Sequence, residues 1–180
     1  DSAEEIEKKK RDFPQAQDLM ESGELEKYEY DNGTYCIVVP RSIDDIYREG
    51  IVLKHCIHTC DIYFQRINIR ETYLLFLRHS AEPDTPWYTV EIEPGGNIRQ
   101  KKSVLNEAYK DLDDAMPFLQ EWQQWVKKNL SEEDKKLAEK SDKARREGYK
   151  KLREQKKIVW HGSLQGTLLA DALESDFMEV

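Results

Sequence analysis

The sequence predicts an α+β fold: a small, mostly antiparallel sheet of about five strands packed with helices, followed by a long charged C-terminal helix. Three short runs between residues 72 and 102 are predicted as strands, and the run over residues 87–93 alternates apolar and polar side chains, as half-buried strands do. Residues 106–128 repeat apolar side chains at helical spacing. Residues 127–157 are charged and contain few apolar side chains, which indicates a solvated helix.

The N-terminal segment, residues 1–27, is charged and is broken once, by Pro14. Its apolar residues are too sparse for a regular amphipathic stripe. We therefore expect one or two short peripheral helices here, which form an extension ahead of the folded core.

A hairpin is expected over residues 28–39. Aromatic and β-branched residues flank the pair Asn32-Gly33, which tolerates the positive φ angles of a type I′ turn. Pro40 then ends the second strand, because proline cannot donate to a sheet ladder.

Two helices are expected next. Ser42 is a typical N-cap, and the acidic residues that follow favour the first turn of a helix over residues 43–49. Gly50 is expected to end that helix. A second helix is predicted over residues 53–64, where Cys56 and Cys60 would share one face.

Three strands follow, over residues 72–78, 87–93 and 97–102. A tight turn at residues 94–96 makes the last two antiparallel, and the polar loop over residues 79–86 lies outside the sheet. In the strand from Trp87, Thr89 and Glu91 point to one face and the apolar residues between them to the other.

The helix predicted over residues 106–128 contains Pro117, which kinks or restarts it, and Trp122 and Trp125, which we assign to core packing. The chain is thus expected to comprise an N-terminal extension (1–27), an α+β core (28–126) and a charged helix with a C-terminal tail (127–180).

The formal charge of −8 and the pI of about 5.2 argue against a protein that coats nucleic acid by charge alone. The charge is unevenly spread, however. Residues 127–157 hold 13 Lys and Arg against 7 Asp and Glu, a net +6, and the other residues carry −14. A nucleic-acid partner would therefore be restricted to the C-terminal helix and to local arginine contacts.

No apolar run is long enough to span a bilayer and no signal peptide is visible, so we expect no membrane partner and a cytoplasmic location. Three cysteines in a chain rich in lysine and glutamate indicate a reducing compartment without a disulfide framework.

The densest group of reactive side chains is the run from His55 to Cys60. Two cysteines and a histidine could supply three zinc ligands, but a fourth is missing nearby. Cys56 could act as a nucleophile, although on a helix His55 would point about 100° away from it. Ordinary packing of Cys60 is the simplest interpretation, and we predict no metal and no cofactor.

A second group comprises His55, Arg78, Glu91 and Gln100, which come from a helix and three successive strands. Histidine and glutamate exchange protons and arginine holds anionic groups, so the set suits metal-independent acid–base chemistry, such as phosphodiester cleavage, or an anion-binding pocket. Surface ion pairs formed by Arg78 and Glu91 are the alternative.

Several linked motifs over about residues 28–125 resemble the PcfJ-like family of bacterial conjugative plasmids, integrative elements and phages. The family pattern Glu-Gly-x-x-Leu-x-His-Cys-Val corresponds to Glu49-Gly50-Ile51-Val52-Leu53-Lys54-His55-Cys56-Ile57. Leu77-Arg78 resembles the family's arginine strand, and Trp87-Tyr88-Thr89-Val90-Glu91-Ile92 resembles its Tyr-Thr-Leu-Glu strand. Gln100 and Asn106 fit its Gln-x-x-Gly-x-x-Asn stretch. The resemblance also suggests that these residues correspond to the C-terminal half of a longer protein.

The resemblance implies one polar set. The set comprises seven residues, for which the resemblance names no reaction. We predict catalytic roles for His55, Arg78, Glu91 and Gln100, and binding roles for Cys56, Thr89 and Asn106. Two departures stand out: Cys60 occupies the usual position of a tyrosine, with Tyr63 nearby, and Ser103 replaces a glycine. An inactive copy of the family site is one consequence of such changes.

Three hypotheses for function follow. The first is an accessory role of a mobile element in handling nucleic acid, either as a nuclease-like enzyme or as a binder. The second is an enzyme that acts on another substrate through Cys56 or His55. The third is a non-enzymatic interaction module in which residues 164–180 dock either on a helix of another mobile-element protein or on the core of the chain itself. We rank the first highest.

Overall fold

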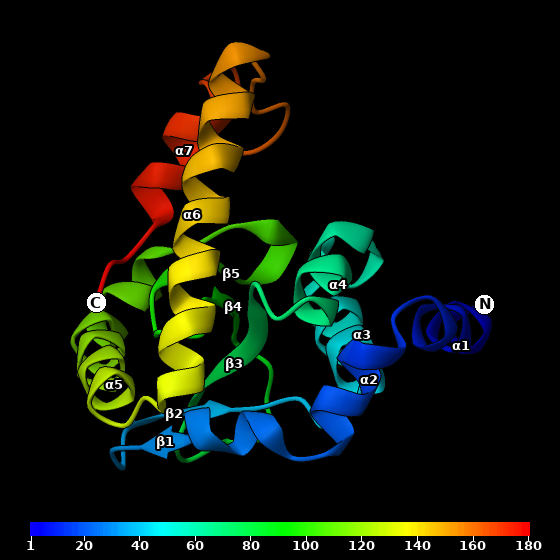
Figure 1. Ribbon diagram of the computed structural model, residues 1–180, viewed down its shortest axis with the longest axis vertical. Coiled ribbons are helices and arrows are strands. Elements are labelled where there is room, and N and C mark those ends of the chain that lie inside the picture. Colours follow the sequence, from blue (N-terminus) through cyan, green and yellow to red (C-terminus); the bar gives the residue numbers. More distant parts are fainter.

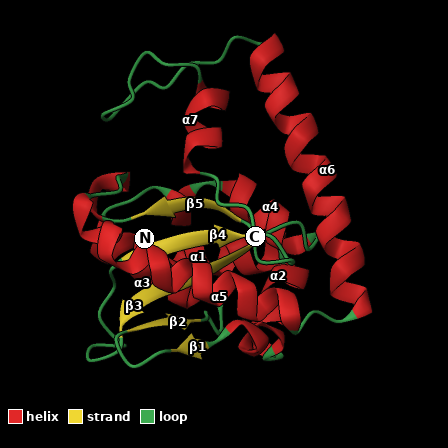
Figure 2. Ribbon diagram, turned by 90° about the vertical axis from the view of Figure 1, so that its left-hand side faces the viewer, coloured by secondary structure: helices red, strands yellow, loops and turns green.

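One antiparallel sheet organises the protein. The computed structural model describes residues 1–180, and its five strands lie side by side in chain order (Figure 2). They are β1 (Tyr30–Asp31), β2 (Tyr35–Val38), β3 (Tyr73–His79), β4 (Tyr88–Ile92) and β5 (Ile98–Lys102). The α+β class and the three predicted strands over residues 72–102 are confirmed.

The hairpin of β1 and β2 forms, but its turn differs from the predicted type I′. That turn needs positive φ at both central residues, and only Gly33 has it, with φ of +92°. The side chain of Asn32 instead accepts hydrogen bonds from the backbone N–H groups of Thr34 and Tyr35, at 3.0 and 2.9 Å. An Asx-type loop therefore replaces the tighter turn.

The apolar face of the sheet packs against α5 (Met116–Lys128) (Figure 1). Trp122 is completely buried there, and its indole N–H donates to the carbonyl oxygen of Tyr28 at 2.8 Å. Pro117 lies in the first turn, where its missing N–H costs no helical bond, so it starts α5. The preceding residues 110–115 form a separate 3₁₀ turn rather than the start of one long helix.

The opposite face of the sheet is covered by α3 (Ile43–Leu53) and α4 (Asp61–Asn68), with α2 (Pro14–Glu21) beside them (Figure 1). Two N-terminal helices form, as expected, but only the first of them is peripheral. α1 (Ser2–Asp12) buries no residue and lies at the periphery, whereas α2 buries Leu19 and Met20 in the main core.

Gly50 was expected to end the first of these helices, and that prediction is wrong: α3 continues to Leu53, and Lys54, with φ of +55°, follows its last turn. The reason for glycine at position 50 is packing. A Cβ atom there would lie 1.8 Å from Nδ1 of His58, so only glycine lets the imidazole ring approach the helix backbone.

Gly50→Ala is expected to lower the free energy of unfolding by about 2 kcal/mol in spite of the better helix propensity of alanine, because the new methyl group displaces His58. Urea denaturation measures the change. Gly148→Ala is the matched control, because a Cβ at that helical position meets no atom within 4 Å, and it should stabilise the protein by up to about 1 kcal/mol. His58→Ala should restore most of the loss in the Gly50→Ala background; failure to do so would contradict this steric explanation.

The predicted helix over residues 53–64 is also wrong in its first half. The left-handed Lys54 turns the chain out of α3, a 3₁₀ turn covers Ile57–Thr59, and α4 begins only at Asp61. Cys56 and Cys60 therefore do not share a helical face.

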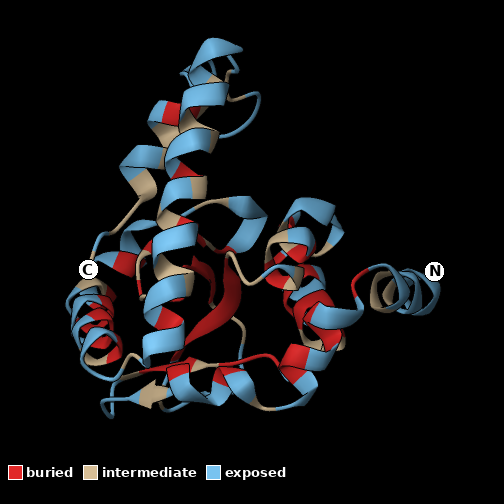
Figure 3. Ribbon diagram, in the orientation of Figure 1, coloured by how far each residue is buried: buried red, intermediate tan, exposed pale blue.

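The charged C-terminal helix is confirmed as α6 (Glu132–Glu154), which runs past the strand ends and projects beyond the core together with α7 (Leu169–Asp176) (Figures 1 and 2). The lower part of α6 is held by buried Ser141 and Arg145, while the projecting part is mostly exposed (Figure 3). None of the helices combines the length and apolarity that crossing a membrane requires.

Candidate functional site

A polar row lies on the sheet face beneath α3 and α4. Strand register places Thr89 opposite Phe76, two residues before Arg78, and pairs Glu91 with Gln100. Because paired residues and residues two apart share a face, Arg78, Thr89, Glu91 and Gln100 all project to the same side. The sheet therefore brings four of the predicted site residues onto one surface.

Glu91 is the centre of this row and is completely buried. Its carboxylate accepts hydrogen bonds from Thr72 Oγ1 at 2.7 Å, from Arg66 Nη1 at 3.0 Å and from Gln100 Nε2 at 3.0 Å. A buried carboxylate needs such partners to offset its lost hydration. Side chains from α4, from β5 and from the residue before β3 thus offset the lost hydration of the Glu91 carboxylate.

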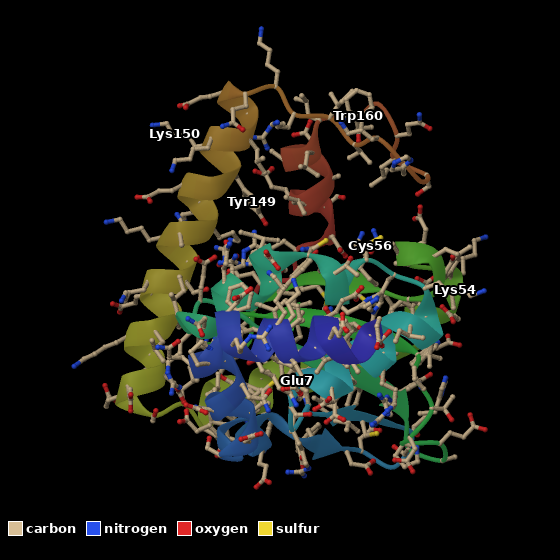
Figure 4. The ribbon with its side chains drawn as sticks, turned by 90° about the vertical axis from the view of Figure 1, so that its right-hand side faces the viewer. Glu7, Lys54, Cys56, Tyr149, Lys150 and Trp160 are labelled. Carbon is tan, nitrogen blue, oxygen red and sulfur yellow. The ribbon has the colours of Figure 1, made fainter.

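Gln100 extends the row toward α4 and α6. Its Oε1 accepts a hydrogen bond from the hydroxyl of Tyr63 at 3.3 Å, and burial raises the pKa of that hydroxyl. A cavity of about 80 Å³ lies beside Gln100, with Arg66 and Glu91 also in its wall. Its other side is formed by α6, including Tyr149, which points from α6 toward α7 (Figure 4).

His55 joins the row at Thr89. It follows the left-handed Lys54, which turns the chain back toward the sheet, and it is only 2 % exposed. Its Nε2 lies 2.8 Å from Thr89 Oγ1, and its buried Nδ1 has no hydrogen-bond partner. Burial lowers the pKa of His55 to about 4, so the imidazole is neutral at pH 7.

Arg78 makes no hydrogen bond or ion pair with the other members of the row. Its guanidinium forms an ion pair with Glu49 of α3 and donates through Nη1 to the carbonyl oxygen of Pro83 at 2.7 Å. A second cavity, of about 430 Å³, adjoins this pair and is also lined by Arg41 and Arg48. The predicted surface ion pairs of Arg78 and Glu91 are in fact buried ones, because helices cover this face of the sheet.

The last two predicted binding residues lie outside the row. Cys56 is exposed (Figure 4). Asn106 is also exposed and has a φ of +63°. It lines a cavity together with Gln100 and residues of the C-terminal tail. Cys36 is buried in β2, and burial raises the pKa of its thiol. No group of three or more His, Cys, Asp or Glu side chains has the geometry to hold a metal ion.

Comparison with known proteins identifies the family. The family model described as PcfJ-like protein matches residues 1–116, which is most of the chain and includes every residue of the polar row. The chain belongs to the PcfJ-like family. Searches of curated proteins and of solved structures find no match.

In this PcfJ-like chain, the partners of the polar row are the residues that the sequence did not reveal. Glu49 stands in the motif that carries the family resemblance, so its position before Gly50 was a usable signal. Arg66 and Thr72 carried none, because each meets Glu91 across about 20 residues of sequence. Tyr63 supplies a hydroxyl to the row although it lies three residues beyond the usual family tyrosine position.

Proposed function

We propose that this PcfJ-like chain has a nucleic-acid-related accessory function in a bacterial mobile genetic element, and that it binds single-stranded nucleic acid in the cytoplasm rather than cleaving it. The element, the bacterial host and the class of partner follow from the family resemblance. The observation that carries the mode of action is the distribution of unpaired positive charge on α6.

Four lysines of α6 recur at helical spacing on its exposed side, and none forms an ion pair: Lys136, Lys140, Lys143 and Lys150. The ion pairs of this helix use other residues, such as Arg145 and Arg153. At 1.5 Å per residue the four lysines span roughly 21 Å. Figure 4 shows Lys150 pointing outward, on the opposite side from Tyr149. Exposed Glu139 and Glu147 lie between these lysines, so the stripe offers separate lysine contacts for phosphates of a nucleic-acid strand rather than a continuous basic surface.

The polar row is less suited to chemistry on a polymer. A general base must reach the proton that it removes, and both His55 and Glu91 are buried beneath helices. The charges of Glu91 and Arg78 are already paired, with Arg66 and Glu49. These features favour a role for the row in holding β3, β4, β5 and the covering helices together.

The test is fluorescence anisotropy with a labelled single-stranded oligonucleotide. Binding is expected at about 50 mM salt and should weaken steeply toward about 200 mM, because lysine–phosphate contacts release counterions. Replacing the four α6 lysines with glutamine should weaken binding at least about tenfold and reduce the salt dependence by roughly 0.7 per lost contact.

A matched control replaces four exposed lysines elsewhere with glutamine, namely Lys8, Lys54, Lys110 and Lys127. It removes the same charge and should bind within about twofold of the wild-type protein if α6 is the contact surface. Equal losses in the two variants would mean that net charge alone controls binding. Absence of binding at low salt would refute the proposed function.

A further inference from the structure

The segment that joins α6 to α7, residues 155–168, forms the far end of the projecting part of the molecule (Figure 1). We call it the tip segment. Its backbone is closed on itself: Val159 N–H donates to Thr167 O at 2.9 Å, and Gly166 N–H donates to Val159 O at 2.8 Å. The first residue of α7 is joined to the start of the tip segment, because the backbone N–H of Leu169 donates to Lys157 O at 2.9 Å. The tip segment is therefore a defined turn that holds its side chains in place.

Trp160 lies on the tip segment and is 70 % exposed, more than any other large hydrophobic residue of the chain (Figure 4). Trp122, by contrast, is completely buried. An indole ring left in water contributes little to folding, since burial of apolar area is what stabilises the core. The position is thus free to serve an interaction.

The stretch of chain around Trp160 carries a positive net charge. Residues 150–168 contain five Lys and Arg against one Glu, a net charge of +4. Arg153 is neutralised by Asp171 and Glu174 of α7, both at 2.7 Å. The four lysines of this stretch form no ion pair: Lys150, Lys151, Lys156 and Lys157. The exposed aromatic ring thus lies three and four residues beyond two unpaired lysines, Lys157 and Lys156.

We propose that Trp160 is a stacking platform for an unpaired base of a single-stranded nucleic acid, whose phosphates contact the lysines of residues 150–157. This inference rests on the proposed function and adds that Trp160 contacts an unpaired base of the bound strand. Every base has a flat π-face that stacks on an aromatic ring, and in a duplex those faces are inaccessible because they stack on neighbouring base pairs. The tip segment projects from the molecule, so it is placed to meet a strand; a helical peptide would need a groove with several apolar anchors.

Trp160→Ala is expected to weaken binding of a single-stranded oligothymidylate about tenfold, whereas Trp160→Phe should retain most of the affinity because it preserves a stacking face. Binding of a duplex with the same number of phosphates should change less than about twofold in either variant. Ile69→Ala is the control, because Ile69 is 67 % exposed at the end of α4, far along the chain from the tip segment. Circular dichroism checks that each variant is folded.

The outcomes separate this inference from the proposed function. If the wild-type protein binds single strands and Trp160→Ala binds equally well, the stacking role is refuted while the proposed function stands. If no strand binds at all, both are refuted. If single-strand binding is unchanged in Trp160→Ala but binding of a polyglutamate peptide is lost, Trp160 serves an acidic protein partner, and the stacking inference is overturned.

Discussion

Replacing Glu93 with alanine is expected to lower the free energy of unfolding by about 3 kcal/mol, because two buried guanidinium groups lose their shared anion and keep only Glu71 and Asp142 as ion-pair partners. Glu93 is 1 % exposed and follows β4. Its carboxylate accepts hydrogen bonds from Arg99 of β5 at 2.7 Å and from Arg145 of α6 at 2.6 Å. Both arginines are 6 % exposed, so water replaces little of the lost interaction.

Urea denaturation followed by tryptophan fluorescence measures this loss. Glu93→Gln preserves the side-chain volume and one acceptor, so it should lose less and remain measurable if the alanine variant fails to fold. Glu139→Ala, on the exposed side of α6, is the control and should stay within about 0.5 kcal/mol of the wild-type protein. A loss below about 1 kcal/mol in Glu93→Ala would mean that the two arginines are hydrated when Glu93 is removed.

Acidification from about pH 7 to about pH 4 is expected to cost about 3 kcal/mol of stability through His55 alone. Burial lowers the pKa of His55 in the folded protein to about 4, whereas an unfolded histidine titrates near its ordinary value of 6.5. Between these two values the unfolded state binds more protons than the folded state. Stability therefore falls as the pH is lowered through this window, and the His55 contribution is constant above it.

The measurement is the free energy of unfolding at several pH values for the wild-type protein and for His55→Gln. The glutamine variant retains a hydrogen-bonding group for Thr89 but cannot titrate, so its stability should depend less on pH by about 3 kcal/mol over the same window. His161→Gln is the control, because His161 is exposed, and its pH dependence should match that of the wild-type protein. Parallel curves for all three proteins would show that His55 does not titrate between the two states as its burial predicts.

The sheet was predictable because its signals are local. Alternation over residues 87–93 and the turn at residues 94–96 predicted the last two strands as an antiparallel pair, and that pairing is confirmed. The helices next to His55 were less predictable. Gly50 is a common helix terminator, yet here it stays inside α3 to accommodate a ring from eight residues later. Lys54 ends the helix in a left-handed conformation that lysine seldom adopts, so the residue at this position did not predict the end of the helix.

In the polar row, too, the features with local sequence signals were predictable and the contacts between distant segments were not. The spacing of Thr89 and Glu91 on one strand predicted a common face, and the register adds Gln100 and Arg78. The partners that neutralise the charges come from elements that meet only in three dimensions, as Arg66 does with Glu91. Whether the row takes part in any chemistry stays a prediction. The row is buried, whereas α6 carries exposed lysines without ion-pair partners. From the sequence alone this charged segment was interpreted as a solvated helix.

The arrangement of the two sheet margins limits how this protein associates with others. β1 is only two residues long. On the other side, Ile98 of β5 exchanges backbone hydrogen bonds with Met178, at 2.9 and 2.8 Å, and the backbone N–H of Lys101 donates to the carboxylate of Asp176 at 3.1 Å. Unpaired strand backbone is the usual template for aggregation and for capture of extended peptides. Here neither margin provides such a template, so the sheet resists polymerisation, and a partner must recognise side chains on the helices and turns.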